Sequence, residues 1–78
     1  SRNDKETDFV TRQGAHVESL IQVCYDLSSE RTLKREIDNI IECAGELKCS
    51  NLIIVTMNEE RVIEKNGYKV KVLPIYKF

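Results

Sequence analysis

Asp8, Gln22 and Cys24 are the residues whose types and spacing come closest to a catalytic site. Gln22 and Cys24 are two positions apart on one expected strand, so both side chains point to one face, and Asp8 lies on the strand expected to pair with it. A magnesium-dependent nuclease carries an aspartate, and then a glutamate and a lysine separated by one residue, at such positions. The carboxylates bind the hard cation, and the lysine orients water or stabilises charge. Glutamine and cysteine supply neither a second carboxylate nor a cation.

With one carboxylate left, Mg²⁺ binding is expected to be weak. Glu6 and Glu18 are candidate substitutes, and Glu18 shares the face of Gln22 by alternation. Cys24 has no activating base or cation beside it in the sequence, which favours an inert thiol over a nucleophile. His16 is the single histidine and is expected to be an exposed strand residue and not a base.

A central strand expected at Val17–Leu27 must position Gln22 and Cys24. Its residues alternate between two faces, and we expect the more apolar face to form the core. Any chemistry would then lie on the face of Gln22 and Cys24. The expected core face comprises Val17, Ser19, Ile21, Val23 and Tyr25.

A helix is predicted after Ser28 or Ser29, either of which can cap its first turn. Apolar residues recur at helical spacing and predict a stripe that packs on a sheet. The stripe comprises Leu33, Ile37, Ile40, Ile41, Ala44 and Leu47.

Strand signals flank this helix on both sides. A short strand at residues 8–11 turns through Gly14 into the central strand. The apolar run at residues 52–56 predicts a buried strand reached by a parallel crossover. Asn66-Gly67 predicts a two-residue type I′ hairpin turn, and Pro74 ends the returning strand or places it at an edge.

The expected architecture is therefore α/β, with a mixed β-sheet and one main helix in the order β-β-α-β-β-β. One helix covers only one face of a sheet. If the other face is apolar, its cover must come from a larger protein or from an oligomer.

Composition narrows the classes of function. A chain of 78 residues is expected to be a single domain over 1–78, and a net charge of −1 argues against a strongly basic nucleic-acid clamp. Three widely spaced cysteines and one histidine favour neither a zinc site nor a disulfide framework, which predicts a reducing, cytoplasmic compartment. The polar start of the chain shows no signal peptide, and its longest apolar run is too short to span a bilayer.

Basic residues concentrate in the first half of the helix, at Lys34 and Arg35, and from residue 61 onward, where Lys69 and Lys71 lie. Two interpretations stay open. These four residues could contact an anionic partner such as nucleic acid, or they could be scattered, solvated charges, with Lys34 paired to Asp38 one helical turn away. The second interpretation is favoured.

Several segments resemble one family when they are taken in order: K-E-T-D-F-V, L-I-Q-V-C-Y-D-L-S, T-L-K-R-E, L-I-I-V-T and K-V-L-P-I-Y-K-F. The chain is similar to the C-terminal domain of unknown function of prokaryotic AAA-type ATPases, a relative of the PD-(D/E)xK restriction-endonuclease-like fold. The family's Glu-Val-Asp-Phe motif is matched by Glu6-Thr7-Asp8-Phe9. Many members carry Glu-Val-Lys where this chain has Gln22-Val23-Cys24.

The resemblance implies a nuclease-like fold with a vestigial site at Asp8, Gln22 and Cys24. We expect a non-catalytic domain, without a cofactor of its own, that engages a protein partner or nucleic acid. ATP binding would belong to an N-terminal ATPase module of the parent protein, and that module is the expected partner. The family's domain usually has a further helix before its first strand.

Two other functions stay open. The alternative to a binding domain is a metal-dependent phosphodiesterase, a DNA nuclease that uses Mg²⁺ through Asp8 and Gln22 with help from Glu6 or Glu18. A pure oligomerisation module is a third reading of the same sequence.

Overall fold

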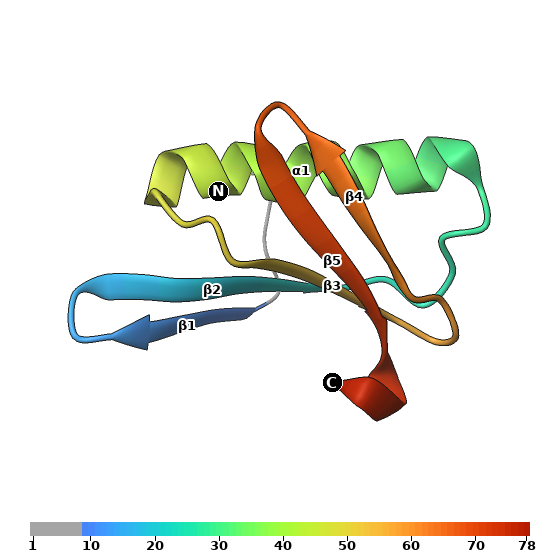
Figure 1. The fold of residues 1–78 in the computed structure, drawn as a ribbon, viewed down its shortest axis with the longest axis horizontal. Helices are drawn as coiled ribbons and strands as arrows, with labels where there is room; N and C mark the ends of the chain where they lie inside the picture. Colours follow the sequence, from blue (N-terminus) through green and yellow to red (C-terminus); the bar gives the residue numbers. More distant parts are fainter. Residues whose placement is uncertain (1–8) are drawn as a thin grey trace.

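Residues 9–78, which the computed structural model describes, form five strands and one long helix in the predicted order (Figure 1). The fold is α/β, as the sequence pattern predicts. A short 3-10 turn, η2 (Ile75–Lys77), follows the last strand. The other elements are β1 (Phe9–Gln13), β2 (His16–Val23), α1 (Glu30–Leu47), β3 (Leu52–Thr56), β4 (Arg61–Lys65) and β5 (Tyr68–Pro74).

The five strands form a single mixed sheet in the spatial order β1-β2-β3-β5-β4. The three central strands β2, β3 and β5 run parallel, and β1 and β4 are antiparallel edge strands. Leu20 of β2 pairs with Leu52 of β3, which in turn pairs with Val70 of β5. The parallel crossover predicted from the strand–helix–strand order is therefore confirmed.

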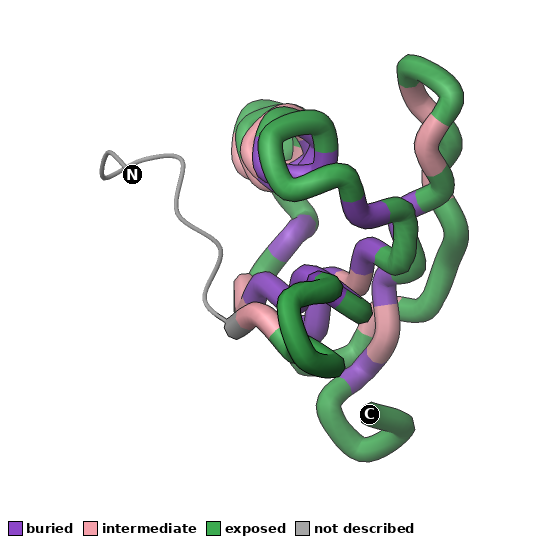
Figure 2. The backbone as a smooth tube through the Cα atoms, turned by 90° about the vertical axis from the view of Figure 1, so that its left-hand side faces the viewer, coloured by how far each residue is buried: buried purple, intermediate pink, exposed green. Residues whose placement is uncertain are grey.

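The core lies between α1 and one face of the sheet, and the buried side of α1 faces the strands (Figure 2). The predicted apolar stripe is confirmed except at Leu47, which is 38% exposed because it is the last residue of the helix. No helix among the described residues is both long enough and apolar enough to cross a membrane. The buried helix residues are Ile37, Ile40, Ile41, Cys43 and Ala44.

The alternation pattern predicted the wrong face of β2 as the core. The helix packs on the face of β2 that carries Leu20 and Gln22. Leu20 is 0% exposed and belongs to the cluster of buried apolar side chains between α1 and the sheet, the helix-side cluster. Tyr25, assigned to the core from sequence, is 69% exposed beyond the end of the strand. β2 has buried residues on both faces, Leu20 and Gln22 on one and Ser19 and Ile21 on the other, so alternation alone does not tell which face the helix covers.

A β-bulge explains why Val17 nevertheless belongs to the helix-side core. The register between β1 and β2 shifts so that Thr11 pairs with Ser19 and Arg12 pairs with Val17. Glu18 is left without a cross-strand partner, and the strand rotates at this point. Val17 is buried within the helix-side cluster as a result, and Glu18 is exposed.

The connection from β2 to α1 begins earlier than predicted, because β2 ends at Val23 and not at Leu27. The Asp26 carboxylate accepts a hydrogen bond from the backbone N–H of Ser28 (2.9 Å), which turns the chain toward the helix. Ser29, one of the two predicted caps, accepts a bond from a backbone N–H of the first helical turn (3.4 Å).

The sheet face opposite α1 is apolar at its centre and carries no α-helix of the described residues. Ile53 and Leu73 are partly exposed there, and Val62 of the edge strand β4 is 59% exposed. Ile53 lies opposite Ile21, and Leu73 lies opposite Val55, so these side chains form neighbouring rows across the strands. Within the described residues, one face of the sheet is therefore left without a helical cover, as expected for a single main helix.

The turn between β4 and β5 has positive φ at both Asn66 (54°) and Gly67 (81°), which confirms the predicted type I′ hairpin. Gly67→Ala is expected to lower the free energy of unfolding by about 1–2 kcal/mol, because a Cβ is strained in this backbone region. No neighbouring atom lies within 4 Å of that Cβ, so the effect is conformational and not steric. Thermal or urea unfolding measures it.

Gly45→Ala is the matched control, since Gly45 is an exposed residue within α1. Its added Cβ would meet only the Tyr68 hydroxyl, at 3.9 Å. Alanine is favoured over glycine in a helix by about 1 kcal/mol, so this variant should be as stable as the parent or more stable. Equal stability of the Gly67→Ala variant and the parent would contradict the turn assignment.

Candidate functional site

Gln22 lies between the sheet and α1, and its side chain is 3% exposed. Its Nε2 donates hydrogen bonds to the backbone carbonyl of Glu36 (3.2 Å) and to the Oε1 of Glu36. The Glu36 side chain is 15% exposed. Oε1 of Gln22 has no hydrogen-bond partner among the described residues. A polar contact at the helix–sheet interface therefore occupies the position where the sequence pointed to a catalytic group.

Glu36 is the residue of this site that the sequence reasoning missed. It comes three residues after Leu33 and four before Ile40, a spacing that places all three on the same side of a helix. A charged residue within an apolar stripe was the available signal. Its half-buried carboxylate accepts a hydrogen bond from Gln22 of the sheet through Oε1, and its Oε2 lies 3.7 Å from Arg35 Nη2.

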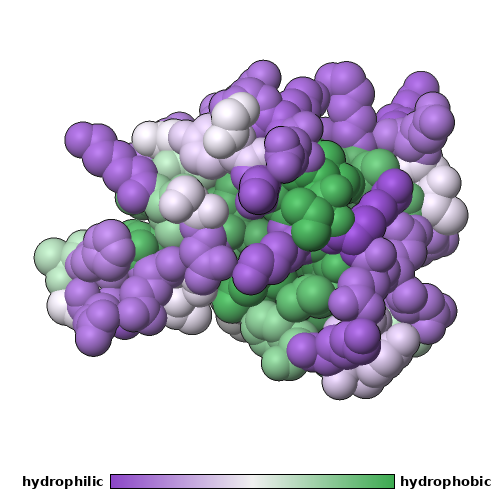
Figure 3. All heavy atoms as spheres, in the orientation of Figure 1, coloured by the Kyte–Doolittle hydropathy of each residue, from purple (hydrophilic) through white to green (hydrophobic). Residues whose placement is uncertain are grey.

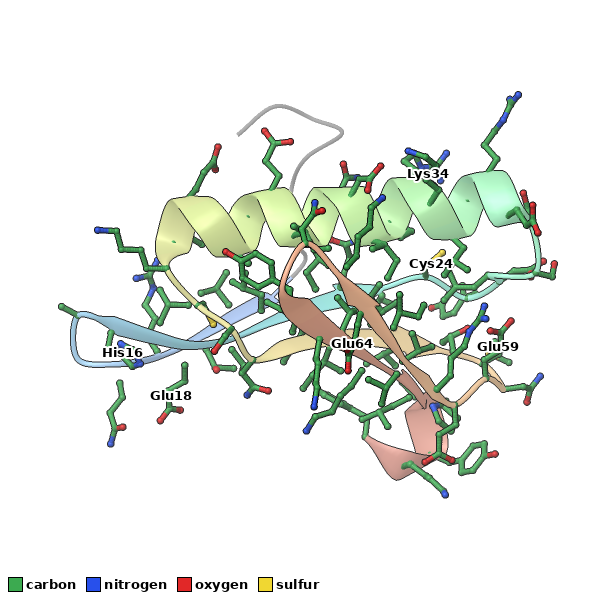
Figure 4. All side chains as sticks on the ribbon, turned by 45° about the horizontal axis from the view of Figure 1, so that its top comes forward. His16, Glu18, Cys24, Lys34, Glu59 and Glu64 are labelled. Atoms are coloured by element: carbon green, nitrogen blue, oxygen red, sulfur yellow. The ribbon has the colours of Figure 1, made fainter. Side chains whose placement is uncertain are left out.

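Cys24 follows the end of β2 and lies beneath the N-terminal half of α1 (Figure 4). Burial, and then the negative charge of Glu36, raise the pKa of the Cys24 thiol. The hydrogen bond that the thiol donates to the Asp26 carbonyl (3.7 Å) and the charge of Arg35 oppose the shift without cancelling it. At neutral pH the sulfur is therefore a protonated thiol, and its surroundings do not activate it.

Cys24 is expected to react slowly with iodoacetamide at pH 7, because only the thiolate attacks. Its rate should rise as the pH approaches a pKa above the ordinary value of a cysteine. Mass spectrometry of the native protein over a pH series measures this rate. Cys43 and Cys49 are buried (7% and 5% exposed) and should react only after unfolding.

Glu36→Gln serves as the control for this titration. It removes a negative charge that raises the pKa of Cys24, so the reaction should reach half of its maximal rate at a lower pH. Rapid modification of the parent chain at pH 7, at the rate of an activated thiol, would contradict this account.

The remaining residues predicted for a nuclease site are not brought to Gln22 by the described structure. Asp8 and Glu6 lie outside the described residues. Glu18 and His16 are exposed at the opposite end of β2 from Cys24 (Figure 4). Within residues 9–78, no group of three or more His, Cys, Asp or Glu residues is arranged to hold a metal ion.

The four basic residues predicted for nucleic-acid contact do not share one surface. Lys34 and Arg35 belong to the N-terminal half of α1, in the helix layer (Figure 4). Lys69 and Lys71 alternate along β5 with Val70 and Val72, which are buried on the helix side, so the two lysines point to the opposite face. Lys69 is 3.9 Å from Glu64 of β4.

Asp38 joins α1 to the edge strand β4. One of its carboxylate oxygens accepts a bond from Lys34 Nζ (2.9 Å), which confirms the predicted pair within the helix. The other oxygen accepts a bond from Lys65 Nζ (2.6 Å). Lys65 and then Lys34 hold the pKa of Asp38 below its ordinary value. At neutral pH this corner therefore carries two ammonium groups on one carboxylate.

A groove of about 390 Å³ lies beside this ion-paired corner, between the N-terminal half of α1 and β4. Leu33, Ile37 and Ile63 line it with apolar surface. Lys34 and Lys65 line it with positive charge, and Glu30 also borders it. The groove can therefore accept an apolar side chain that has a carboxylate nearby.

Comparisons of the chain with family models, with curated proteins and with solved structures find no match. Two features of the structure therefore bear on the function of the chain. These are the closed polar contact between Gln22 and Glu36 and the groove between α1 and β4.

Proposed function

We propose that this chain is a non-catalytic protein-interaction domain, with a nuclease-like fold, from the C-terminal part of an AAA-type ATPase. One observation carries the proposal: Gln22 is buried beneath α1 with its amide held by Glu36. In a working nuclease this strand position supplies a carboxylate to a cation that must also reach water and substrate phosphate. Here the helix covers the position, and the side chain is neutral.

Cys24 supports the same proposal, because it stands where a nuclease of this type carries a lysine. A cysteine is either a neutral thiol or an anionic thiolate, so it offers no positive charge to a phosphate in the transition state, and its raised pKa also keeps it from forming the thiolate at physiological pH. The two positions that would have to supply charge are thus both uncharged in this chain.

A protein partner is favoured over nucleic acid by the distribution of charge. Lys34 and Arg35 lie on the helix layer and Lys69 and Lys71 on the opposite face, so no single surface combines the four cations. Lys34 and Lys69 also have carboxylates beside them. The proposed partner is the ATPase module of the parent protein. Cys24, Cys43 and Cys49 form no disulfide in the described structure, which supports a reducing, cytoplasmic compartment for the whole protein.

The second candidate, a metal-dependent phosphodiesterase, is favoured by one specific observation. Oε1 of Gln22 is a buried acceptor without a partner among the described residues. An oxygen in that state could ligate a cation together with Glu36 or with Asp8.

An amide-shift titration of the folded chain separates the two functions. Mg²⁺ or Mn²⁺ is added first, then a short DNA duplex. The interaction domain predicts no localised metal response at Gln22, Cys24 or Glu36. Local Mn²⁺ broadening that disappears in Asp8→Ala and Glu36→Gln would establish the phosphodiesterase site and lead to cleavage assays. DNA shifts along Lys69 and Lys71 would assign a nucleic-acid partner instead.

A further inference from the structure

The outer edge of β4 is open in the described structure. β4 is the last strand in the sheet order, and it pairs only with β5. That ladder runs from Arg61 opposite Val72 to Lys65 opposite Tyr68 without a register shift. A regular edge strand presents a row of unpaired backbone N–H and C=O groups to an incoming strand. At the other edge, the ladder that holds β1 to β2 is interrupted by the bulge at Glu18, opposite Thr11 and Arg12.

The side chains of β4 are those of a strand that accepts a neighbour. Charged residues usually protect an edge strand, and β4 carries such charges at Arg61, Glu64 and Lys65, but the two residues between them, Val62 and Ile63, are apolar. Val62 is 59% exposed on the face opposite α1. Ile63 faces α1 and lines the groove with Leu33 and Ile37. Figure 3 shows apolar surface gathered in the middle of this view, where β4 and β5 lie in front of α1.

The charge around the groove defines the complementary ligand. Lys34 and Lys65 approach the groove with side chains that are 72% and 38% exposed, and both share the single carboxylate of Asp38. An ammonium group has three donors, so each lysine can still bind another carboxylate. Arg31 adds positive charge on the same half of α1, whereas the charge of Arg35 is offset by Glu36 at 3.7 Å and Glu30 borders the groove with a carboxylate.

The alternation of side chains along β4 determines which residues of an added strand would meet the groove and the lysines. Ile63 and Lys65 are two residues apart and point to the same side of the strand. A strand added beside β4 would place side chains directly opposite both residues on that side. An apolar residue opposite Ile63 would enter the groove, and an acidic residue two positions away would meet Lys65 and Lys34.

We propose that β4 and the groove beside it bind an extended segment of a partner protein by β-strand addition, with an apolar residue and an acidic residue two positions apart. This inference specifies a partner class for the interaction role proposed above and rests on it. Backbone hydrogen bonds to the edge supply affinity, and the groove with its lysine pair supplies selectivity.

The ¹⁵N-labelled chain is titrated with a pool of acetylated octapeptides. In each peptide an acidic residue and an apolar residue lie two positions apart, and polar residues alternate with them. The apolar position is Ile, Val, Leu or Phe. Binding should shift the amides of residues 61–65 together with those of Leu33 and Ile37. N-methylation of alternate peptide amides should weaken binding by at least about tenfold, because strand addition depends on the backbone.

Charge exchange tests the selectivity. Lys65→Glu should weaken binding of the acidic peptides by about tenfold, and peptides with lysine in place of the acidic residue should restore it. Lys71→Glu, on the opposite face of the neighbouring strand and opposite the apolar Val62, is the matched control and should leave binding unchanged. Rescue by the lysine peptide shows that Lys65→Glu still folds.

Three results overturn the inference: no binding across the pool at millimolar peptide, shifts that map to β1 in place of β4, or equal binding of the N-methylated peptides. The metal titration judges the proposed function separately. If the chain responds to neither metal nor peptide, the proposed interaction role stands, but β4 and its groove are not the binding surface. A chain that binds Mn²⁺ at Gln22 loses the non-catalytic role whatever the peptides do.

Discussion

Ile40→Ala is expected to lower the free energy of unfolding by about 2–5 kcal/mol. Ile40 is 0% exposed and belongs to the cluster that joins α1 to Leu20, Leu52 and Val70 of the three parallel strands. Truncation removes buried methylene and methyl groups and leaves a cavity that a packed interface cannot fully close. A domain of 78 residues has a total stability of about 4–12 kcal/mol, so the variant loses a large share of it.

Urea unfolding followed by far-UV circular dichroism measures the change, and Leu47→Ala is the matched control. Leu47 lies in the same helix and the same predicted stripe but is 38% exposed, so its truncation should cost less than about 1 kcal/mol. If Ile40→Ala and Leu47→Ala unfolded at the same urea concentration as the parent, α1 would not pack on the sheet as described.

Gln22→Glu is expected to lower the free energy of unfolding by about 2–4 kcal/mol at pH 7, and it also tests the proposal that Gln22 belongs to a vestigial nuclease site. The substitution restores the residue type that a nuclease carries at this strand position. In this structure, however, the introduced carboxyl group would be buried against the carboxylate of Glu36. Burial and like charge both disfavour ionisation, so the folded-state pKa of the introduced group rises above the value of about 4.3 in the unfolded chain.

The sign of the pH dependence follows from this raised pKa. Between the two pKa values the folded variant binds more protons than the unfolded variant, so its stability falls as the pH rises. Relative to the parent, Gln22→Glu should therefore be nearly unimpaired near pH 4 and most impaired above pH 7. Urea unfolding of both proteins at several pH values gives the difference.

The exchanged pair Gln22→Glu/Glu36→Gln is the control for this effect. It keeps one carboxylate and one amide at the contact and should lie within about 1 kcal/mol of the parent at pH 7. A single variant with the same stability as the parent at every pH would show that Gln22 and Glu36 are not in contact. Mn²⁺ binding gained by Gln22→Glu would show instead that the position can still serve a metal.

Local signals in the sequence were enough to predict most of the elements. The apolar spacing of Ile37, Ile40 and Ala44 identified α1, and Asn66-Gly67 identified the β4–β5 turn. Helical periodicity and a positive-φ turn are properties of neighbouring residues, so they can be read without knowledge of the rest of the fold.

The candidate site was only half predictable. Gln22 and Cys24 were predicted to share one face of the strand, but that face was placed away from the core, whereas α1 covers it. Two causes acted together: β2 lies within the sheet and is apolar on both faces, and the bulge at Glu18 reverses the alternation near its start. Glu36 went unnoticed although its spacing from Leu33 and Ile40 placed it on the apolar side of the helix, since the donor that accommodates it comes from a strand distant in sequence.

By itself the sequence determined the order of strands and helix, the hairpin turn and the stripe that α1 buries, because each depends on short-range periodicity. Only the tertiary structure decided which face of β2 meets α1, that Gln22 bonds to Glu36, and that Lys34 and Lys65 converge on Asp38. Each of these contacts joins residues from separate elements, and their meeting depends on strand order and register. Local pattern does not encode that information, since the same alternation is compatible with either face of the sheet.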